Sequence, residues 1–346
     1  MIPAHSAPRQ PAGQSRPSEQ ASEADWHRLL AQGYREVGAL LQDLSLSAEE
    51  LAEPVDPATP FPLRVPRGYV ARMRPGDPTD PLLRQVLPLD RENDAVPGYV
   101  NDPVGDLDSR QSAGVLHKYP GRALLVTTGA CAIHCRYCFR RHFPYGEENA
   151  GRKRWRNSLE AVAADDSIRE VILSGGDPLS LDNDKLRPLI EGLGKIAHVE
   201  RLRIHTRLPV VLPERIDPEL VALLTAFPGP VCLVIHANHA QELDESVARA
   251  LGPLREAGVL LLNQAVLLKG VNDSVSAQED LSARLTALAV APYYLHQLDP
   301  VAGAAHFQVS DHRARTIIDE LRRLAPGYMV PRLVQEIPGD QAKRPL

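Results

Sequence analysis

From about residue 118 onward, the chain alternates about six times between short apolar runs and helical patterns. Continuous apolar strands separated by helices are typical of a parallel sheet covered by helices, because a helix carries the chain from the end of one strand to the start of the next. The predicted fold class is therefore α/β, a partial (β/α)6 barrel of the TIM type, with an open doubly wound sheet as the less favoured alternative. The predicted strands are Arg122–Thr128, Glu170–Ser174, Leu202–Thr206, Val231–His236, Val259–Val266 and Pro292–Gln297, and helical patterns cover Asp244–Ala257 and Val275–Ala289.

The N-terminal part differs from this regular part, since fifteen of the 31 prolines lie in residues 1–103. Residues 1–21 have the composition of a disordered tail. From Ser22 apolar residues recur at helical spacing, and Ser47 begins a capping box for a further short helix. Residues 54–103 predict an extended arm against the rest of the protein. The predicted organisation is a tail (1–21), a helical and proline-rich extension (22–115), the barrel (116–300) and a C-terminal helix with a final segment (301–346).

Composition and charge exclude several classes of protein. Hydrophobic residues make up 43% and charged residues 24%, which are globular values, and the net charge of -5 is unlike that of a general nucleic-acid binder. No apolar run reaches the roughly 18–20 residues that span a bilayer, and the N-terminus lacks the apolar segment of a secretory signal. The chain is therefore predicted to be cytoplasmic and to bind neither nucleic acid nor membrane.

Polar or reactive residues follow each predicted strand. Parallel α/β folds place their chemistry at the carboxyl ends of the strands, which share one edge of the sheet. Six such ends predict a single site. They carry the cysteines 131–138, Ser174 with residues 175–178, the groups 205–207 and 236–239, Gln264, and the group 296–299.

Three of the four cysteines lie within eight residues, as Cys131-Ala-Ile-His-Cys135-Arg-Tyr-Cys138. A disulfide scaffold spreads its cysteines along the chain, so this clustering indicates a metal or cluster site. Three thiolates on one loop can bind three irons of a [4Fe-4S] cube and leave the fourth iron open. The alternative is zinc, whose structural sites usually close four positions with two C-x2-C pairs or with Cys and His. Cys232, in an apolar run, is interpreted as a buried core thiol.

The spacing C-x3-C-x2-C, with an aromatic residue before the last cysteine, resembles the radical S-adenosylmethionine superfamily. The resemblance implies that the open iron binds the amine and carboxylate of S-adenosyl-L-methionine. The reduced cluster then cleaves the sulfonium to give a 5′-deoxyadenosyl radical, which abstracts a hydrogen atom. Gly175-Gly176-Asp177 resembles the superfamily's motif that receives the methionine amino group, although Gly-Gly-Asp-Pro alone is a common turn.

A longer series of motifs resembles the lysine 2,3-aminomutases over roughly residues 90–346. Within that family, the chain is similar to the bacterial subfamily that makes (R)-β-lysine for modification of translation elongation factor P. The resemblance implies an isomerase that converts L-α-lysine to (R)-β-lysine by 1,2-amino migration, with an electron donor such as flavodoxin or ferredoxin as partner. The alternatives are a 2,3-aminomutase for another amino acid and a non-catalytic iron–sulfur protein. The motifs are Tyr119-Pro-Gly-Arg122, Cys138-Phe-Arg-Arg141, 208–216, 236–239, 263–273 and 293–297.

Enzymes of this family also use pyridoxal 5′-phosphate, whose aldehyde a lysine holds covalently. By resemblance that lysine is Lys343, because residues 338–343 match the glycine-rich segment before the family's cofactor lysine, although only Gly339 of that segment is kept. From the residues alone, Lys343 reads as one of two cations in a frayed tail. The cofactor phosphate is expected to meet Lys118, Tyr119 and Arg122, for which the alternative is a solvated pair at a strand start.

The resemblance also assigns residues to the substrate and to S-adenosyl-L-methionine. Arg140 matches the arginine that binds the substrate carboxylate, and Asp299 matches an aspartate that pairs with the substrate ε-ammonium. Glu336 aligns with the family's second aspartate and has one more methylene. Asp299-Pro300 is alternatively a turn. Contacts to the adenosyl portion are expected from His236 and Gln264, and Tyr137 is expected either to stack on adenine or to pack in the core.

Overall fold

The computed structural model describes residues 23–112, 114–148 and 152–346, and a ten-stranded sheet runs through this part of the chain. The tail predicted for residues 1–21 lies outside the described residues. Each strand is hydrogen-bonded to its neighbour in sequence, so the order across the sheet is β1 to β10. The strands are β1 (Arg110–Ser112), β2 (Val115–Tyr119), β3 (Arg122–Thr128), β4 (Glu170–Gly175), β5 (Arg201–Thr206), β6 (Val231–Ile235), β7 (Leu260–Val266), β8 (Ala291–His296), β9 (Arg332–Gln335) and β10 (Arg344–Pro345).

The helices flank this sheet, and most of the longer ones connect consecutive strands. Both helical segments named from the sequence are confirmed, as α10 and α11, and the side chains of Asp244 and Ser274 cap their N-termini. The helices are α1 (Glu23–Ala31), α2 (Val37–Asp43), α3 (Arg67–Val70), α4 (Pro81–Arg84), α5 (Tyr145–Glu148), α6 (Arg152–Ala164), α7 (Asn183–Gly194), α8 (Leu208–Val211), α9 (Pro218–Thr225), α10 (Glu245–Glu256), α11 (Val275–Ala287) and α12 (Asp311–Leu324).

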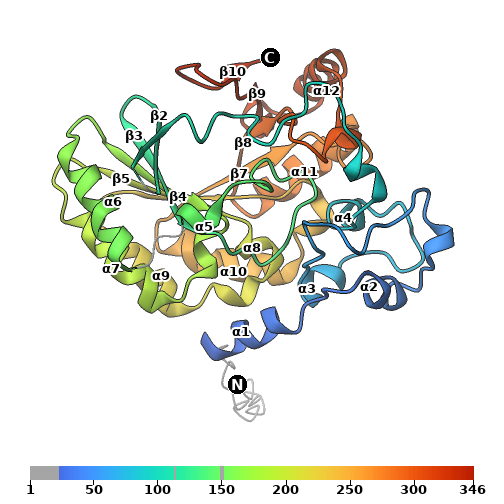
Figure 1. Ribbon diagram of the computed structural model, residues 1–346, viewed down its shortest axis with the longest axis horizontal. Coiled ribbons are helices and arrows are strands. Elements are labelled where there is room, and N and C mark those ends of the chain that lie inside the picture. Colours follow the sequence, from blue (N-terminus) through green and yellow to red (C-terminus); the bar gives the residue numbers. More distant parts are fainter. Residues whose placement is uncertain (1–22, 113, 149–151) are drawn as a thin grey trace, which may run out of the picture.

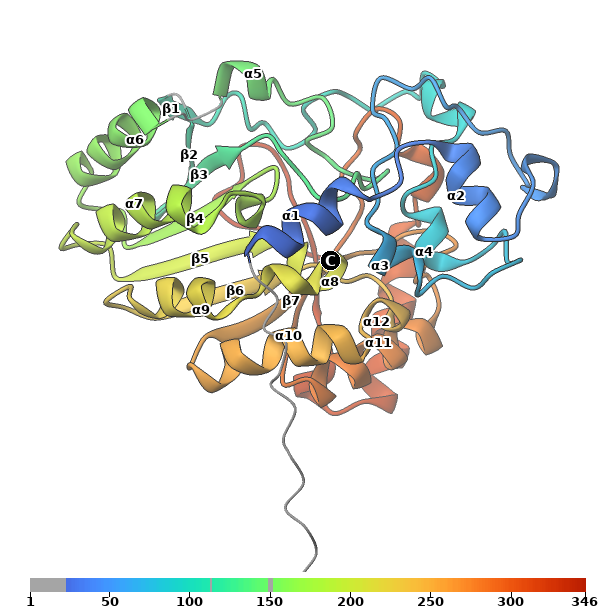
Figure 2. The ribbon, with the colours of Figure 1, turned by 90° about the horizontal axis from the view of Figure 1, so that it is seen from below.

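The six predicted strands are confirmed as β3 to β8, and all six are parallel. Strand β9 extends the parallel set, while β1, β2 and β10 join antiparallel at the two edges. The sheet is curved, with the longer helices along its outer face (Figures 1 and 2). The two edges approach each other across the inner face, since Nζ of Lys118 on β2 lies 3.0 Å from Oε1 of Glu336, just after β9. The predicted partial barrel is confirmed in place of the open doubly wound sheet.

Alternation along each strand separates the hydrophobic core from the site. On β5, Leu202 and Ile204 are fully buried in the core between the sheet and the helices. The intervening Arg203 and His205 face the inner side, because successive side chains of a strand point to opposite faces. Arg203 binds both carboxylate oxygens of Glu170 on β4 through its Nη2. The inner face therefore carries polar and charged side chains in place of an apolar filling.

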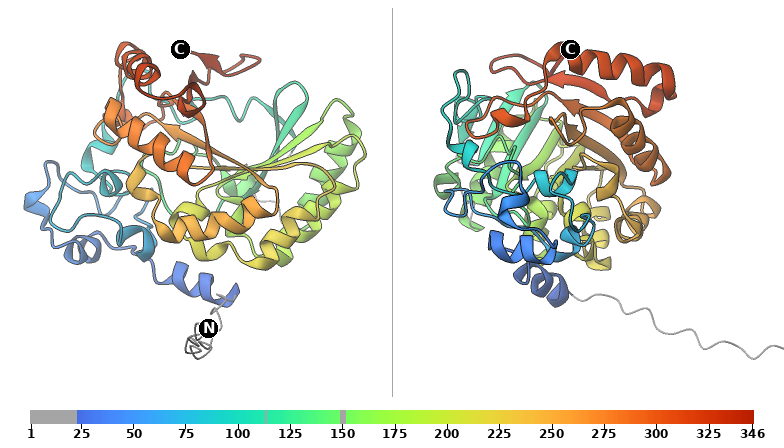
Figure 3. Two further views of the ribbon diagram at one scale, coloured as in Figure 1. Left: turned by 180° about the vertical axis from the view of Figure 1, so that it is seen from behind. Right: turned by 90° about the vertical axis from the view of Figure 1, so that its right-hand side faces the viewer.

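The N-terminal extension packs on one side of the barrel, where its blue and cyan segments gather in Figures 1 and 3. Helices α1 and α2 fall where apolar spacing predicted them, and Trp26 of α1 is fully buried beneath the guanidinium of Arg215. The capping box at Ser47 is confirmed as the start of a short 3-10 helix over Ala48–Glu50. Residues 54–109 form an arm of loops and short helices that reaches the edge of the barrel where the strands end. No helix among the described residues is both long and apolar enough to cross a membrane.

Candidate active site

The cysteine loop connects β3 to α5 and holds Cys131, Cys135 and Cys138 as partly buried free thiols. Burial and the neighbouring thiols raise the pKa of Cys131 well above its ordinary value, and burial and Cys135 raise the pKa of Cys138 to about 11. A metal that binds these sulfurs must therefore displace protons. Within the described residues, no three His, Cys, Asp or Glu side chains converge as ligands of a single ion. A cube binds each thiolate through a different iron, and three cysteines on one loop can supply those thiolates.

The N-terminal arm holds the backbone of this loop. The amide of His134 donates to the carbonyl of Arg64 at 2.9 Å, and that of Arg136 donates to Gln85 at 2.9 Å. Two arginines of the loop share one buried carboxylate: Nε of Arg136 lies 2.8 Å from Glu92, and Nη2 of Arg141 lies 2.7 Å from it. These contacts fix the loop from outside the barrel.

Replacing Glu92 by glutamine is expected to lower the free energy of unfolding by about 3–5 kcal/mol, because two buried guanidinium groups lose their counter-charge. Urea denaturation followed by circular dichroism measures this change. The matched control is Glu53→Gln, which breaks the exposed ion pair of Arg91 with Glu53 and should cost less than about 1 kcal/mol. Equal effects of the two substitutions would contradict the argument.

The turn Gly175-Gly176-Asp177, at the end of β4, packs against the start of the cysteine loop. Gly175 has a φ of +118°, and a Cβ on Gly176 would collide with the carbonyl oxygen of Ala130. The amide of Asp177 donates to that same oxygen at 2.8 Å. The Asp177 carboxylate accepts from Thr206 Oγ1 and from the amide of Arg207, both at 2.7 Å, so it ties the end of β4 to the end of β5. The described contacts of this motif thus position the loop, and its predicted contact with the methionine amine stays a prediction.

Arg207 is a site residue that the sequence marked only as the polar end of a strand. Its Nη1 lies 2.7 Å from Sγ of Cys135, and its Nη2 lies 2.8 Å from the buried carboxylate of Glu242. The same Nη2 also donates to Gln85 and Tyr69. Arg207 therefore places a fixed positive charge against a sulfur that is predicted to bind iron as a thiolate.

Lys343 lies inside the barrel opening and is not a frayed tail. Its Nζ forms an ion pair with Oε2 of Glu336, whose other oxygen accepts from Lys118 at 3.0 Å. Although burial opposes ionisation, the two ammonium groups lower the pKa of Glu336 to about 2. Strand β10 begins at the next residue and pairs with β9, which fixes the backbone beside Lys343. The tail interpretation is wrong because a strand and a buried carboxylate both hold this segment.

Asp106, which the sequence did not single out, connects the arm to this charged group. Its side chain is almost fully buried, with Oδ1 at 2.5 Å from Nζ of Lys118 and Oδ2 at 2.6 Å from Nε of Arg140. Although burial opposes ionisation, these two cations hold the pKa of Asp106 below its usual value. Arg140 also donates from Nη1 to Ser174 Oγ at the end of β4, at 3.0 Å. The arm therefore contributes one carboxylate to the inner face of the barrel.

Asp299 follows β8 and faces the same cluster. Burial, together with the neighbouring carboxylate of Glu336, raises the pKa of Asp299 to about 7, while Lys343 and Lys118 oppose this shift. Oδ1 of Asp299 is buried and accepts no hydrogen bond from any described residue. The cluster thus joins the carboxyl ends of strands to the C-terminal segment and brings Lys343, Glu336, Asp299, Lys118 and Arg140 together.

The residues predicted to contact the adenosyl portion of S-adenosyl-L-methionine or the cofactor phosphate differ in burial and in their contacts. The Tyr137 ring is buried in a small apolar cluster, and its hydroxyl lies 2.9 Å from Nε2 of His236, whose pKa burial lowers to about 3. Gln264 is partly buried on the inner side of β7. The Arg122 guanidinium stacks 4.6 Å above the ring of Tyr119, at the turn from β2 to β3. Their assigned roles remain predictions.

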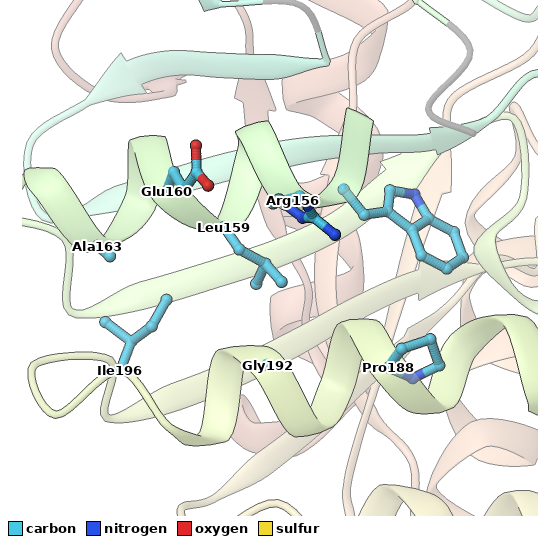
Figure 4. Close-up of a pocket in the computed structure, with 8 residues that line it drawn as sticks. Arg156, Leu159, Glu160, Ala163, Pro188, Gly192 and Ile196 are labelled. Carbon is cyan, nitrogen blue, oxygen red and sulfur yellow. The ribbon is translucent and has the colours of Figure 1, made fainter. Parts of the chain in front are cut away.

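An apolar surface groove of about 620 Å³ lies apart from this site, between α6 and α7 on the outer side of the barrel (Figure 4). It is bordered by residues of α6 and α7 and by Ile196 just after α7, and by none of the predicted site residues. Strand ends do not contribute to it. Among its lining residues are Trp155, Leu159, Pro188, Gly192 and Ile196.

Comparison with known proteins shows the family to which this chain belongs. A family profile described as "4Fe-4S single cluster domain" matches residues 120–202, which include the cysteine loop. The L-lysine 2,3-aminomutase of Escherichia coli (strain K12) is 47% identical over 94% of this chain and 95% of its own length. The chain belongs to the lysine 2,3-aminomutase family. The enzyme named L-lysine 2,3-aminomutase from Clostridium subterminale is 35% identical over 93% of this chain and 77% of its own length.

Lysine 2,3-aminomutases use a [4Fe-4S] cluster, S-adenosyl-L-methionine and pyridoxal 5′-phosphate. The donor set of this chain fits the cluster, since its three free thiols share one loop. It also fits the phosphate cofactor, since two lysines, Lys343 and Lys118, meet at Glu336 in the barrel opening. Among solved structures, SuiB of Streptococcus suis, in a crystal structure bound to S-adenosylmethionine, is similar over 65% of this chain and 52% of its own, with 14% identity and a TM-score of 0.46.

Proposed function

We propose that this chain converts L-α-lysine to (R)-β-lysine by moving the amino group from carbon 2 to carbon 3. The observation that carries the proposal is the position of Lys343, paired with Glu336 on the inner face of a barrel whose strand ends hold the cysteine loop. A non-catalytic iron–sulfur protein has no use for a partly buried lysine at that place. The relatives named L-lysine 2,3-aminomutase support the same reaction.

Cys131, Cys135 and Cys138 would hold the cluster, and Lys343 would hold pyridoxal 5′-phosphate, with Lys118 and Arg122 for its phosphate. Together with S-adenosyl-L-methionine, these groups supply the hydrogen-atom abstraction and the unsaturated nitrogen that an amino migration between neighbouring carbons requires. Arg207 supplies positive charge beside Cys135. The arm holds the cysteine loop in position through the contact of Arg136 with Glu92.

The charged cluster has the groups to bind both ends of lysine. Arg140 is the cation for the α-carboxylate, and Asp106 fixes its Nε edge and leaves part of the guanidinium fork for a ligand. Asp299 and Glu336 are the anions for the ε-ammonium. A neutral or anionic side chain at that end would leave a buried carboxylate unpaired, so this pair favours a cationic substrate. Holding both ends fixes the two central carbons between which the nitrogen moves.

The Michaelis constant for lysine is expected to fall by about tenfold as the pH rises from 6 to 8. Burial and Glu336 raise the pKa of Asp299 to about 7, so its carboxyl group is mostly protonated below that pH and attracts an ammonium only above it. Steady-state assays across this range measure the change. Asp299→Asn should show a high Michaelis constant with little pH dependence, and a wild-type profile in that variant would contradict the assignment.

The decisive test is turnover by the anaerobically reconstituted enzyme with S-adenosyl-L-methionine, pyridoxal 5′-phosphate and a chemical reductant. L-Lysine, L-arginine and L-glutamate are supplied in parallel, and the β-amino acid is identified by chiral chromatography. We expect (R)-β-lysine from lysine and no comparable product from the other two. If only arginine or glutamate gives a product, that amino acid is the substrate in place of lysine. If enzyme with its full cofactor content gives no product from any of the three, the proposed mutase activity is wrong.

Flavodoxin or ferredoxin as the electron donor, and elongation factor P as the acceptor of the β-lysine, stay predictions from the resemblance. A cytoplasmic location stays a prediction as well. Each can be tested by its own measurement: reduction of the cluster by the purified donor, and the mass of elongation factor P in cells that lack this enzyme.

A further inference from the structure

His205 begins the run His205-Thr206-Arg207 at the end of β5, and its role differs from those of the other two residues. Thr206 binds Asp177 and Arg207 binds Cys135, whereas His205 points to the inner face of β5 together with Arg203. Nε2 of His205 is buried, and no described residue gives it a hydrogen-bond partner. A buried polar atom without a partner costs about 1–3 kcal/mol, so such atoms in folded proteins ask for an explanation.

Strand register and electrostatics relate His205 to both ends of the proposed site. Ile204 pairs with Leu173 of β4, and the next residue of β4, Ser174, accepts a hydrogen bond from Arg140. The charges that act most strongly on His205 are those of Arg203, Lys343 and Arg140. Burial, and then these cations, hold the pKa of His205 well below its usual range, so the ring is neutral at physiological pH. Lys343 is the amine proposed for the cofactor aldehyde, and Arg140 is the group proposed for the substrate carboxylate.

The neighbours also indicate which kind of partner Nε2 lacks. Ammonium and guanidinium groups are donors only, so none of these cations could accept a hydrogen bond from Nε2, and none lies within hydrogen-bond distance of it. An N–H on Nε2 needs an acceptor, and the three neighbouring cations offer none. The tautomer with hydrogen on Nε2 therefore leaves a donor that a ligand oxygen between Lys343 and Arg140 would satisfy.

We propose that His205 is a ligand-binding residue of this active site, whose Nε2–H donates to an anionic oxygen of the molecule held between Lys343 and Arg140. This inference rests on the proposed function, since that function places a ligand there. Two oxygens have the required chemistry: the ring hydroxyl oxygen of pyridoxal 5′-phosphate and the α-carboxylate of the amino acid. A purely structural histidine would instead have its partners within the protein.

The test compares two substitutions in the reconstituted full chain. His205→Leu removes the donor at similar size, and His205→Gln keeps an N–H at about the reach of Nε2. Equilibrium dialysis measures the affinity for pyridoxal 5′-phosphate, and then, on cofactor-loaded enzyme without S-adenosyl-L-methionine, the affinity for L-lysine. The control is Cys232→Ala on the neighbouring strand β6, paired in register with Arg203. Circular dichroism establishes that each variant is folded.

His205→Leu is expected to weaken one of the two affinities about tenfold to a hundredfold, as for a lost hydrogen bond to a charged group, and His205→Gln to recover most of it. Weaker binding of pyridoxal 5′-phosphate identifies the ring oxygen, and weaker binding of lysine alone identifies the carboxylate. Affinities within twofold of wild type in His205→Leu, or an equal loss in both His205 variants, overturn the inference. Failure of the wild type to bind pyridoxal 5′-phosphate overturns the proposed function itself, and this is visible without any His205 variant.

Discussion

Replacing any one of Cys131, Cys135 and Cys138 by alanine is expected to lower the iron content sharply and to reduce lysine turnover to background. The three thiolates of this loop are the protein ligands that we propose for the cluster, so a missing sulfur would leave a second iron without its protein ligand. The fold should persist, because the loop is held by backbone hydrogen bonds to Arg64 and Gln85 rather than by these side chains. Iron and acid-labile sulfide analysis, with circular dichroism, measures both expectations.

Cys232→Ala is the control for that experiment. Its thiol lies on β6 among Arg203 and Glu170, at the other end of the barrel from the cysteine loop, and burial raises its pKa to about 11. The variant should retain iron, sulfide and turnover. Full iron content in a variant that lacks Cys131, Cys135 or Cys138, or its loss in Cys232→Ala, would contradict the assignment of the cluster.

Lys343→Ala is expected to lower turnover by on the order of a thousandfold or more and to abolish covalent retention of pyridoxal 5′-phosphate. The substitution removes the amine that we propose as the holder of the cofactor aldehyde, and it leaves Glu336 with Lys118 as a remaining partner. Borohydride reduction followed by mass spectrometry of the tryptic peptides tests covalent retention directly, and it does so without any turnover.

Arg344→Ala is the matched control, because the adjacent side chain is exposed and pairs with Asp340 at 2.9 Å outside the charged cluster. We expect its cofactor content and turnover to remain within about twofold of wild type. A cofactor adduct on another lysine, or normal turnover in Lys343→Ala, would require a different cofactor lysine and a different arrangement of the site.

Local patterns were sufficient for most of the barrel. The strands β3 to β8 were predictable because each is rich in apolar residues and lies between helical patterns, and β3 begins and ends at the predicted residues. Strands β1, β2, β9 and β10 were not, since short edge strands such as Arg110–Ser112 and Arg344–Pro345 carry no apolar run. Their pairing depends on contacts with the barrel. As a result, the sheet extends past both boundaries that composition predicted, at 115 and at 300.

The site residues also fall into two groups, those that the sequence indicated and those that it did not. The three cysteines could be proposed as cluster ligands from their local spacing. Lys343 could be proposed as the cofactor lysine only through the family resemblance. Asp106 and Arg207 were missed, since each acts on residues far away in sequence: Asp106 on Arg140, and Arg207 on Cys135. A lone acidic residue in a proline-rich arm gives no periodic or spacing signal, so only the folded chain reveals its partner.

The hydrogen bonds between the arm and the cysteine loop have a consequence for the enzyme that has lost its cluster. In many small metal proteins the chain collapses when the metal leaves, because the metal is what folds it. Here the bonds from Arg136 to Glu92 and from His134 to Arg64 involve neither iron nor sulfide. These bonds would hold the loop in place when iron and sulfide are absent. Refilling the site would then require iron and sulfide but no refolding of this segment.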